Sequence, residues 1–548
     1  MRRLLLSIGL IVVTLLAPAI RAQEHAHSHG EMEALGKVNF PTSCRDVDAE
    51  FTRAVALLHS FGYEEARRAF EAVAAKDPAC AMAYWGIAMT WYHPIWAPPN
   101  SQELAAGTAA AKKAAELGAT NERERGFIGA IGAFYRDAGR LNHPARAQAY
   151  RNLLLQLSEQ LPDDHEVQIF YALSLLGTAP PGDATFANQK KVAAILNGLL
   201  PLEPQHPGIT HYMIHSFDYP QLAADALPAA RAYAQIAPDS PHALHMPSHI
   251  YTRLGLWPDS ITSNLASADA GRLLVERRHP GAASMDTLHA LDYLEYAYLQ
   301  MGNEDAARNV LVEAATAKTF DDPTFAAGYA LAAIPARYAL ERRDWNAAAQ
   351  LEPPAAALPW TNFSYAPAIV YFAQTIGASR AGELDRARSA LGQLEKIHMD
   401  LLKSPIPGPY DWTSQVESSR LAAAAWLVYA EGQKDAAVTM ARAAATLEQK
   451  TGKHPVTPGP PLPARELLGD MLLEMGQPAE ALAAYEASLH DAPNRFNSIY
   501  GAARAAELSK NMDRARELYT ALLEQSVANS PRPELAQART FVDGGRRE

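Results

Sequence analysis

A twelve-residue step from alanine to proline recurs in this chain and constrains its fold more than any other feature. The three copies run from Ala66 to Pro78, from Ala226 to Pro238 and from Ala481 to Pro493. In each copy apolar residues recur every third or fourth position, as on one face of an amphipathic helix, and the proline ends the helix. The pattern therefore predicts helices of similar length that pack in a recurring way.

The rest of the chain has the same character. Alanine-rich segments with helical periodicity follow one another through short turns, and no segment shows the alternating pattern of a strand. Turn glycines precede the second helix of several pairs, at Gly62, Gly255, Gly302, Gly382 and Gly476. Pairs of helices that recur along a chain stack into a solenoid. We therefore predict an all-α fold, a superhelix of helical hairpins with a concave groove.

This arrangement resembles the tetratricopeptide repeat, in which small residues lie where two helices touch and a proline ends the second helix. The resemblance covers roughly residues 45–525 and implies about ten to twelve hairpins. The chain also resembles a group of exported bacterial tetratricopeptide proteins. The shared motifs are SC…CAMAYWG.AM at residues 43–89, HY.IHS.D at 211–218 and HMPSHI..RLG.W at 245–257. This resemblance implies an architecture and no particular activity.

The two ends of the chain differ from the repeats. Two arginines, a short apolar run and a small-residue site at Ala22 are typical of a secretory signal peptide, with an uncleaved anchor as the alternative. The expected segments are a signal peptide (1–22), a His-rich flexible segment (23–40), the repeat body (41–450), a Pro-rich loop (451–463), C-terminal repeats (464–530) and a tail (531–548). The protein is then expected to be periplasmic or secreted, with no membrane span after cleavage.

Charge and cysteine content narrow the partners and the compartment. A net charge of −11 and the lack of a basic stripe argue against a nucleic-acid partner. Cys44 and Cys80 are the only cysteines in the sequence. In an exported protein such a pair predicts a disulfide bond.

Histidines cluster at one place in the repeat pattern. His211 and His245 lie 34 residues apart, as do His215 and His249, and 34 residues is the tetratricopeptide period. His242 shares one helical stripe with His245 and His249, within about 60° of arc. The two groups therefore occupy equivalent places in adjacent hairpins.

The same register extends to neighbouring residues. Asp218 continues the stripe of the first group, and alignment on Gly255 and Gly302 brings His289, Asp292 and Tyr296 to the places of His242, His245 and His249. By resemblance to tetratricopeptide proteins, these places face the concave groove. We expect six imidazoles and two carboxylates to converge there, with Arg253, Tyr251 and Tyr296 as supporting residues.

Converging imidazoles and carboxylates are typical of a transition-metal site. Close imidazoles oppose one another's protonation, and a cation removes that conflict. Imidazole donors without thiolate suit copper or zinc, with iron as a further candidate, and the number of donors allows two ions with an open position for water or substrate. A metal-free binding or acid–base site and a purely structural role are the alternatives. Arg253 would hold an anionic substrate or form a salt bridge with Asp218.

The mature N-terminus is a second metal candidate. Cleavage after Ala22 places His25 third, where an amine, two amides and an imidazole form a square-planar set for copper or nickel. His27 and His29 add donors, whereas cyclisation of Gln23 would remove the amine. A flexible tail without a metal is the alternative.

No nucleophile elbow, phosphate loop, dinucleotide fingerprint or HExxH motif occurs in the sequence. We therefore expect an exported metalloprotein whose metal lies in the groove, and whether it is an enzyme stays open. The alternatives are a periplasmic scaffold that binds peptide or protein partners and a metal-handling protein for copper or zinc.

Overall fold

Helices joined by short turns make up this protein in a computed structural model that describes residues 34–354, 358, 360, 363–406, 408 and 410–544. All of these residues belong to one compact unit. In this part of the chain the only β pairing is an isolated bridge between Ala283 and Phe320. The all-α prediction is confirmed. The expected signal peptide and His25, His27 and His29 lie outside the described residues.

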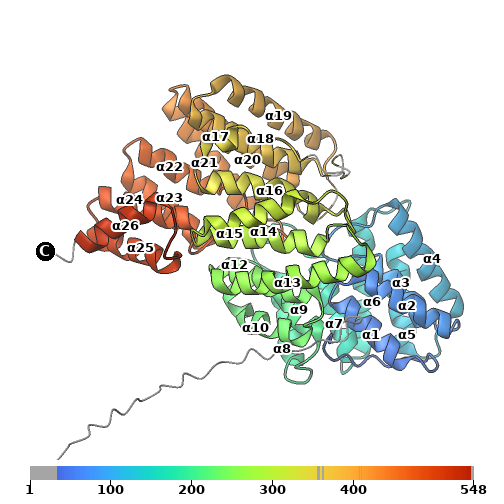
Figure 1. The fold of residues 1–548 in the computed structure, drawn as a ribbon. Coiled ribbons are helices and arrows are strands. Elements are labelled where there is room, and N and C mark those ends of the chain that lie inside the picture. Colours follow the sequence, from blue (N-terminus) through green and yellow to red (C-terminus); the bar gives the residue numbers. More distant parts are fainter. Residues whose placement is uncertain are drawn as a thin grey trace, which may run out of the picture. The chain divides into compact units, whose positions relative to one another are not determined.

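Consecutive helices pair as hairpins that follow one another along the chain (Figure 1). The first hairpins are α1 (Asp48–His59) with α2 (Tyr63–Lys76), α3 (Ala81–Thr90) with α4 (Ser101–Leu117), α5 (Glu122–Tyr135) with α6 (His143–Gln160), and α7 (His165–Leu176) with α8 (Ala187–Leu199). The middle hairpins are α9 (Pro207–Phe217) with α10 (Leu227–Ile236), α11 (Pro241–His245) and α12 (Pro247–Leu254) with α13 (Trp257–Arg278), α14 (Met285–Gln300) with α15 (Glu304–Ala315), and α16 (Phe325–Glu341) with α17 (Trp345–Ala349). The last elements are α18 (Tyr365–Ala381) with α19 (Leu384–Lys403), α20 (Trp412–Ala430) with α21 (Lys434–Thr451), α22 (Ala464–Glu474) with α23 (Pro478–Asp491), α24 (Phe496–Leu508) with α25 (Met512–Gln525), and α26 (Pro533–Gly544). A short 3₁₀ helix, Ala223–Ala226, precedes α10.

Small residues lie where the helices meet, as the repeat interpretation requires. Ala66, Ala230 and Ala481 are at most 1% exposed. A Cβ on Gly86 would lie 2.4 Å from the ring of Phe70, so α2 and α3 approach each other too closely for a side chain there. The helices that carry the alanine-to-proline step therefore pack against neighbouring helices through their alanine-bearing faces.

The turns agree with the glycine pattern with one exception. Gly255, Gly302, Gly382 and Gly476 have φ between 64° and 80°, which glycine adopts without a Cβ clash. Gly62 has a φ of −72°, and its neighbour Phe61 takes the left-handed conformation instead, with a φ of 54°. The ring of Phe61 contacts three of the clustered histidines, His211, His215 and His242.

The predicted disulfide is confirmed. Cys44 and Cys80 are bonded, with their Cα atoms 4.9 Å apart. Cys80 is also the N-cap residue of α3, where its sulfur accepts a hydrogen bond from the backbone N–H of Ala83 at 3.2 Å. The bond therefore ties the segment before α1 to the first turn of the second hairpin.

Two segments expected to be irregular are partly ordered. Leu35 and Phe40, in the segment expected to be flexible, are 2% and 3% exposed. The expected tail includes α26, which packs against α25 through the buried side chains of Leu535 and Ala538. Both segments contain apolar side chains that the compositional interpretation overlooked.

The Pro-rich loop packs across the middle hairpins instead of extending into solvent. We call residues 452–463, between α21 and α22, the strap. The Nζ of Lys453 donates to Asp218 at 2.9 Å, and the hydroxyl groups of Tyr293 and Tyr329 donate to strap carbonyls, those of Val456 at 3.1 Å and Gly459 at 2.9 Å. The strap therefore covers Asp218 at the end of α9 and residues of α14 and α16.

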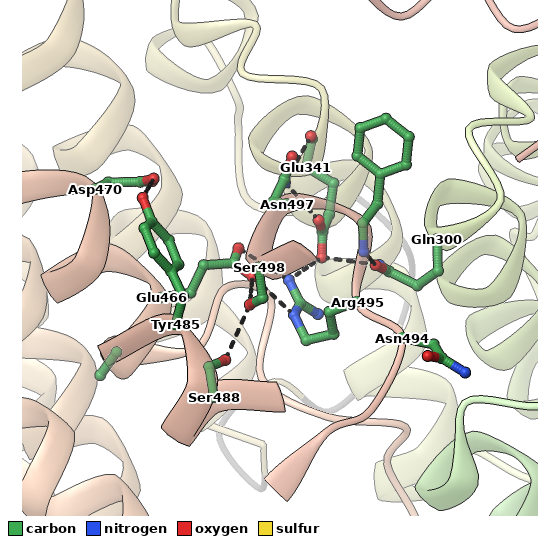
Figure 2. A network of polar contacts seen from close by, with 12 residues as sticks. Gln300, Glu341, Glu466, Asp470, Tyr485, Ser488, Asn494, Arg495, Asn497 and Ser498 are labelled. Carbon is green, nitrogen blue, oxygen red and sulfur yellow. Dashed lines mark hydrogen bonds and ion pairs between the residues drawn. The ribbon is translucent and has the colours of Figure 1, made fainter. Parts of the chain in front are cut away.

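A buried polar network joins the C-terminal hairpins to the middle of the chain. Arg495, between α23 and α24, donates to Glu466 at 3.0 Å, to Glu341 at 2.6 Å and to the hydroxyl of Tyr296 at 2.9 Å. Figure 2 shows Arg495 between the two carboxylates, with Gln300 accepting from the backbone N–H of Phe496 at 2.9 Å. The network connects α22 and α24 to α14 and α16.

Candidate metal centre

Six histidine side chains converge in two sets of three. Set A contains His211 and His215 of α9 and His242 of α11, and set B contains His245 of α11, His249 of α12 and His289 of α14. Within each set, one ring nitrogen per residue lies within 4.8 Å of the others. The structure thus brings together all six histidines of the sequence-based site.

The separations within each set suit metal coordination. In set A the Nε2 of His211 lies 3.0 Å from the Nε2 of His242 and 3.1 Å from that of His215. In set B the Nε2 atoms of His245 and His249 are 3.0 Å apart. Two imidazole nitrogens bound to one tetrahedral ion at 2.0–2.1 Å would lie about 3.3 Å apart. Small side-chain movements would therefore accommodate an ion.

The two sets are adjacent. The ring centroids of His215 and His249 are 6.2 Å apart, and those of His242 and His245 are 6.4 Å apart. The adjacency follows from the helix pattern, because His242 and His245 lie on one helix and serve different sets. Two ions bound in these sets would be near neighbours.

Hydrogen bonds to the outer nitrogens fix the tautomers in set B. The Nδ1–H of His249 donates to the carboxylate of Asp218 at 3.0 Å. The Nδ1–H of His245 donates to the amide oxygen of Asn264 at 2.6 Å, and this amide is held in place because its Nδ2 donates to the carbonyl of Ser260 at 2.8 Å. Each neutral ring then has its lone pair on Nε2. The two lone pairs face each other across 3.0 Å.

Set A has one comparable anchor. The Nδ1–H of His211 donates to the backbone carbonyl of His59 at 2.7 Å, which leaves a lone pair on its Nε2. Outer hydrogen bonds of this kind orient metal-binding imidazoles and increase their basicity. In set A, therefore, the lone pair of His211 is directed toward His215 and His242.

Five of the six clustered histidines are buried and His215 is half-buried, which corrects the expectation of an open groove. His211, His245 and His249 are 0%, 2% and 1% exposed, because the strap and the α1–α2 turn with Phe61 lie over them. Burial, followed by the neighbouring imidazoles, lowers the pKa of His215, His242, His245 and His289, and burial lowers the pKa of His211 to about 3. Burial also lowers the pKa of His249, although Asp218 acts in the opposite direction. The six imidazoles are therefore neutral at physiological pH and available as ligands.

Asp218 supports the site from outside. Burial raises its pKa, but the charges of Lys453 and Arg253 outweigh this effect and hold the pKa well below its usual range. Arg253 donates to the Oδ1 of Asp218 at 2.8 Å, so the salt-bridge interpretation of Arg253 is the one the structure shows. The Oδ2 atom accepts from both His249 and Lys453.

Three expected site residues lie elsewhere. Asp292 accepts from the buried Nη1 of Arg337 at 2.6 Å, and Tyr296 accepts from Arg495. Tyr251 lines a hollow beside Arg231 and Pro258. The same alignment correctly placed His289 in set B. It misplaced Asp292 and Tyr296 because their partners, Arg337 and Arg495, come from other hairpins.

The sequence interpretation also missed several participants. The hydroxyl of Tyr293 lies 3.4 Å from the Nδ1 of His249, and it follows His289 by four residues, the spacing already seen in both histidine pairs. That spacing could have identified Tyr293. Asn264, Phe61 and Lys453 come from distant segments, and no local pattern links them to the histidines.

The repeated hairpins define an all-α helical-repeat protein with a tetratricopeptide-like fold, and the two histidine sets define its candidate metal centre. The tetratricopeptide repeat family profile matches residues 472–540, within α22 to α26. Comparison with curated proteins gave no match. None of the helices in the described part of the chain is long and apolar enough to cross a membrane.

Several solved structures are similar at low sequence identity. Yeast Tom70 is 11% identical with a TM-score of 0.33, over 91% of this chain and 95% of that chain. A human IFIT1 dimer with m7Gppp-AAAA is 13% identical with a TM-score of 0.36, over 81% and 90%. Cut9 in the APC/C hetero-tetramer Cut9–Hcn1 is 12% identical with a TM-score of 0.33, over 90% of each chain.

Proposed function

We propose that this chain is a metalloprotein in which sets A and B each bind one transition-metal ion. The observation that carries the proposal is the pair of facing lone pairs on His245 and His249, 3.0 Å apart. Two neutral imidazoles in this arrangement repel each other, and a bound cation converts the repulsion into two coordinate bonds. Protonation of one ring would also relieve it, but burial opposes a charged imidazole here.

Copper is the first candidate metal and zinc the second, with iron as a further possibility. The six inner ligands are all imidazoles, which suit each of these metals, and the divalent affinity order places copper highest. Three protein ligands per ion leave a fourth position for water or a small substrate, as in catalytic sites. We therefore infer a metal-dependent enzyme as the finer function, with its reacting position between the histidine sets and the strap.

The compartment proposed for this function is the periplasm or the exterior. The Cys44–Cys80 disulfide supports it, because such bonds persist in oxidising compartments. A tetratricopeptide scaffold that binds peptide or protein partners is a second candidate function, supported by the match at residues 472–540. The two functions are compatible, because the matched segment and the histidine sets lie in different hairpins.

The test removes one ligand from each set. The His215→Ala/His249→Ala chain should lose two equivalents of metal relative to the unsubstituted chain, measured by elemental analysis after equilibrium dialysis against copper or zinc. Its helical circular dichroism should stay nearly unchanged. All chains in the comparison carry His25→Ala, His27→Ala and His29→Ala, which removes the N-terminal candidate site.

A matched control substitutes two histidines outside the sets. His165→Ala/His490→Ala should keep both equivalents, since neither residue belongs to set A or set B. Full metal content in the His215→Ala/His249→Ala chain would refute the proposed centre.

A further inference from the structure

A third cluster of metal-ligand side chains lies beside set A. His59 ends α1, Glu166 lies in the first turn of α7, and His206 precedes α9 as its N-cap residue. The Nε2 of His59 is 3.0 Å from the Oε2 of Glu166, and the Nε2 of His206 is 3.0 Å from its Oε1. One ligand atom from each residue lies within 4.8 Å of the others. Three segments far apart in sequence therefore bring two imidazoles and a carboxylate to one point.

Glu166 is a buried carboxylate whose ion-pair partners are two imidazoles. Glu166 is 3% exposed, and its ion pairs within the described residues are with His59 and His206, which are 0% and 2% exposed. The nearby Arg123 forms an ion pair with Asp164. A buried carboxylate usually pairs with a full cationic charge or binds a metal ion. Here two imidazoles are its partners, which is the environment expected around a cation.

The surroundings hold His59 in place and leave room beside Glu166 and His206. The Nδ1 of His59 bonds to the hydroxyl of Tyr212 at 2.9 Å, which orients Nε2 toward Glu166. A side chain at Gly208 would lie 2.6 Å from the Nδ1 of His59, so the close packing at this point requires glycine. Glu166 and His206 also line a cavity of about 250 Å³. That cavity provides space for water or another small ligand on an ion.

We propose that His59, Glu166 and His206 form a third metal site, which binds a single divalent ion of the zinc or ferrous class. Two imidazoles and a carboxylate with an open side suit these ions. The site is distinct from set A but adjacent to it, because the carbonyl of His59 accepts from the Nδ1 of His211 at 2.7 Å. The proposal does not depend on the function proposed for sets A and B.

Zinc and cobalt binding test the site directly. The same His25→Ala/His27→Ala/His29→Ala background is used throughout. In the His215→Ala/His249→Ala chain, cobalt(II) should titrate as one equivalent with visible absorption bands, since the third site stays intact. Adding Glu166→Gln should abolish this equivalent, because the amide keeps the shape but removes the charge.

A second variant shows whether loss of metal comes from a lost ligand and not from misfolding. His206→Ser removes a ligand but places a favoured N-cap residue at the start of α9, where His206 makes no side-chain cap bond. This chain should fold and should also lose the equivalent. His165→Gln is the matched control, because His165 lines the same cavity without belonging to the cluster, and this chain should keep the equivalent.

The outcomes separate this site from sets A and B. If both proposals hold, the chain with intact sets binds three equivalents of zinc, and Glu166→Gln reduces this to two. If sets A and B bind nothing, the same substitution reduces one equivalent to none. Equal zinc content with and without Glu166→Gln and His206→Ser, or no cobalt in the His215→Ala/His249→Ala chain, would overturn the third site.

Discussion

The group that accepts a hydrogen bond from the Nδ1–H of a neutral imidazole determines that its Nε2 carries a lone pair and can bind a metal ion. Asp218 and Asn264 differ in charge, yet each holds the proton of a set B imidazole on Nδ1. The inner nitrogens of His245 and His249 then face each other with no proton from either ring between them. A polar cluster designed only for hydrogen bonding would instead alternate donors and acceptors. The arrangement of single residues therefore favours a metal site over a structural one.

Glu448 allows a residue-scale prediction on pH. Burial raises its pKa to about 7, while its Oε1 accepts from the backbone N–H of Ala464 at 2.8 Å, where the strap ends. The folded pKa lies above the ordinary value, so the folded chain holds the proton between about pH 4.5 and 7. The stability from this group is present below about pH 4.5 and is lost as the pH rises through 7.

Glu448→Gln should therefore stabilise the protein at pH 8, because the amide can still accept from Ala464 without carrying a charge. The gain should be about 1–2 kcal/mol at most, since the side chain is partly exposed and solvent screens its charge. Thermal unfolding of both chains at pH 5 and pH 8 measures the effect. A gain that is the same at both pH values would show that charge is not its cause.

Single residues also mark the limit of prediction from sequence. The histidine spacings predicted five imidazoles of sets A and B, because ligands on one helix face repeat locally, and alignment on the turn glycines predicted the sixth, His289. Asp292 was misassigned because its partner, Arg337, lies 45 residues away in another hairpin. Glu166 and His206 were missed because their cluster depends on a contact between α1, α7 and α9.

Between whole elements, the strap is the main departure from the predicted fold. A Pro-rich sequence predicts an irregular segment but not where that segment lies. Here tyrosines of α14 and α16 bind the strap carbonyls, and the ring of His454 contacts those of Phe325 and Trp412. These contacts are long-range, so helical periodicity could predict the hairpins but not the cover over the histidines.

The contact between the C-terminal and middle hairpins leads to an element-scale prediction. Arg495 is fully buried between Glu341 and Glu466, as Figure 2 shows. Arg495→Met should lower the free energy of unfolding by about 3–5 kcal/mol, because two buried carboxylates lose their shared cation. Urea unfolding followed by circular dichroism would measure this loss.

Arg442→Met is the matched control for Arg495→Met. Arg442 pairs with Glu480, and both side chains are more than half exposed. Solvent already screens this pair, so its loss should cost less than about 1 kcal/mol. Similar losses in the two variants would mean that the buried network does not hold the hairpins together.

At the scale of the whole molecule, the repeat explains why the histidines of sets A and B converge. Stacked hairpins present equivalent positions side by side, so a histidine pair repeated after 34 residues meets its copy in space. The ligands of sets A and B come from α9, α11, α12 and α14, across three successive hairpins. A bound pair of ions would therefore add crosslinks to the packing and hydrogen bonds that already join these elements.

Metal loading should consequently raise the melting temperature of the whole chain. Binding to the folded state alone stabilises it by about 2.7 kcal/mol per site when free metal is 100 times the Kd. In a protein of this size that gain corresponds to a shift of a few degrees, and a chelator should reverse it. The His215→Ala/His249→Ala chain, in the background without the N-terminal histidines and with Glu166→Gln to remove the third site, should show no shift. A metal-dependent shift that survives in that chain would mean that the stabilising ion binds outside the three clusters.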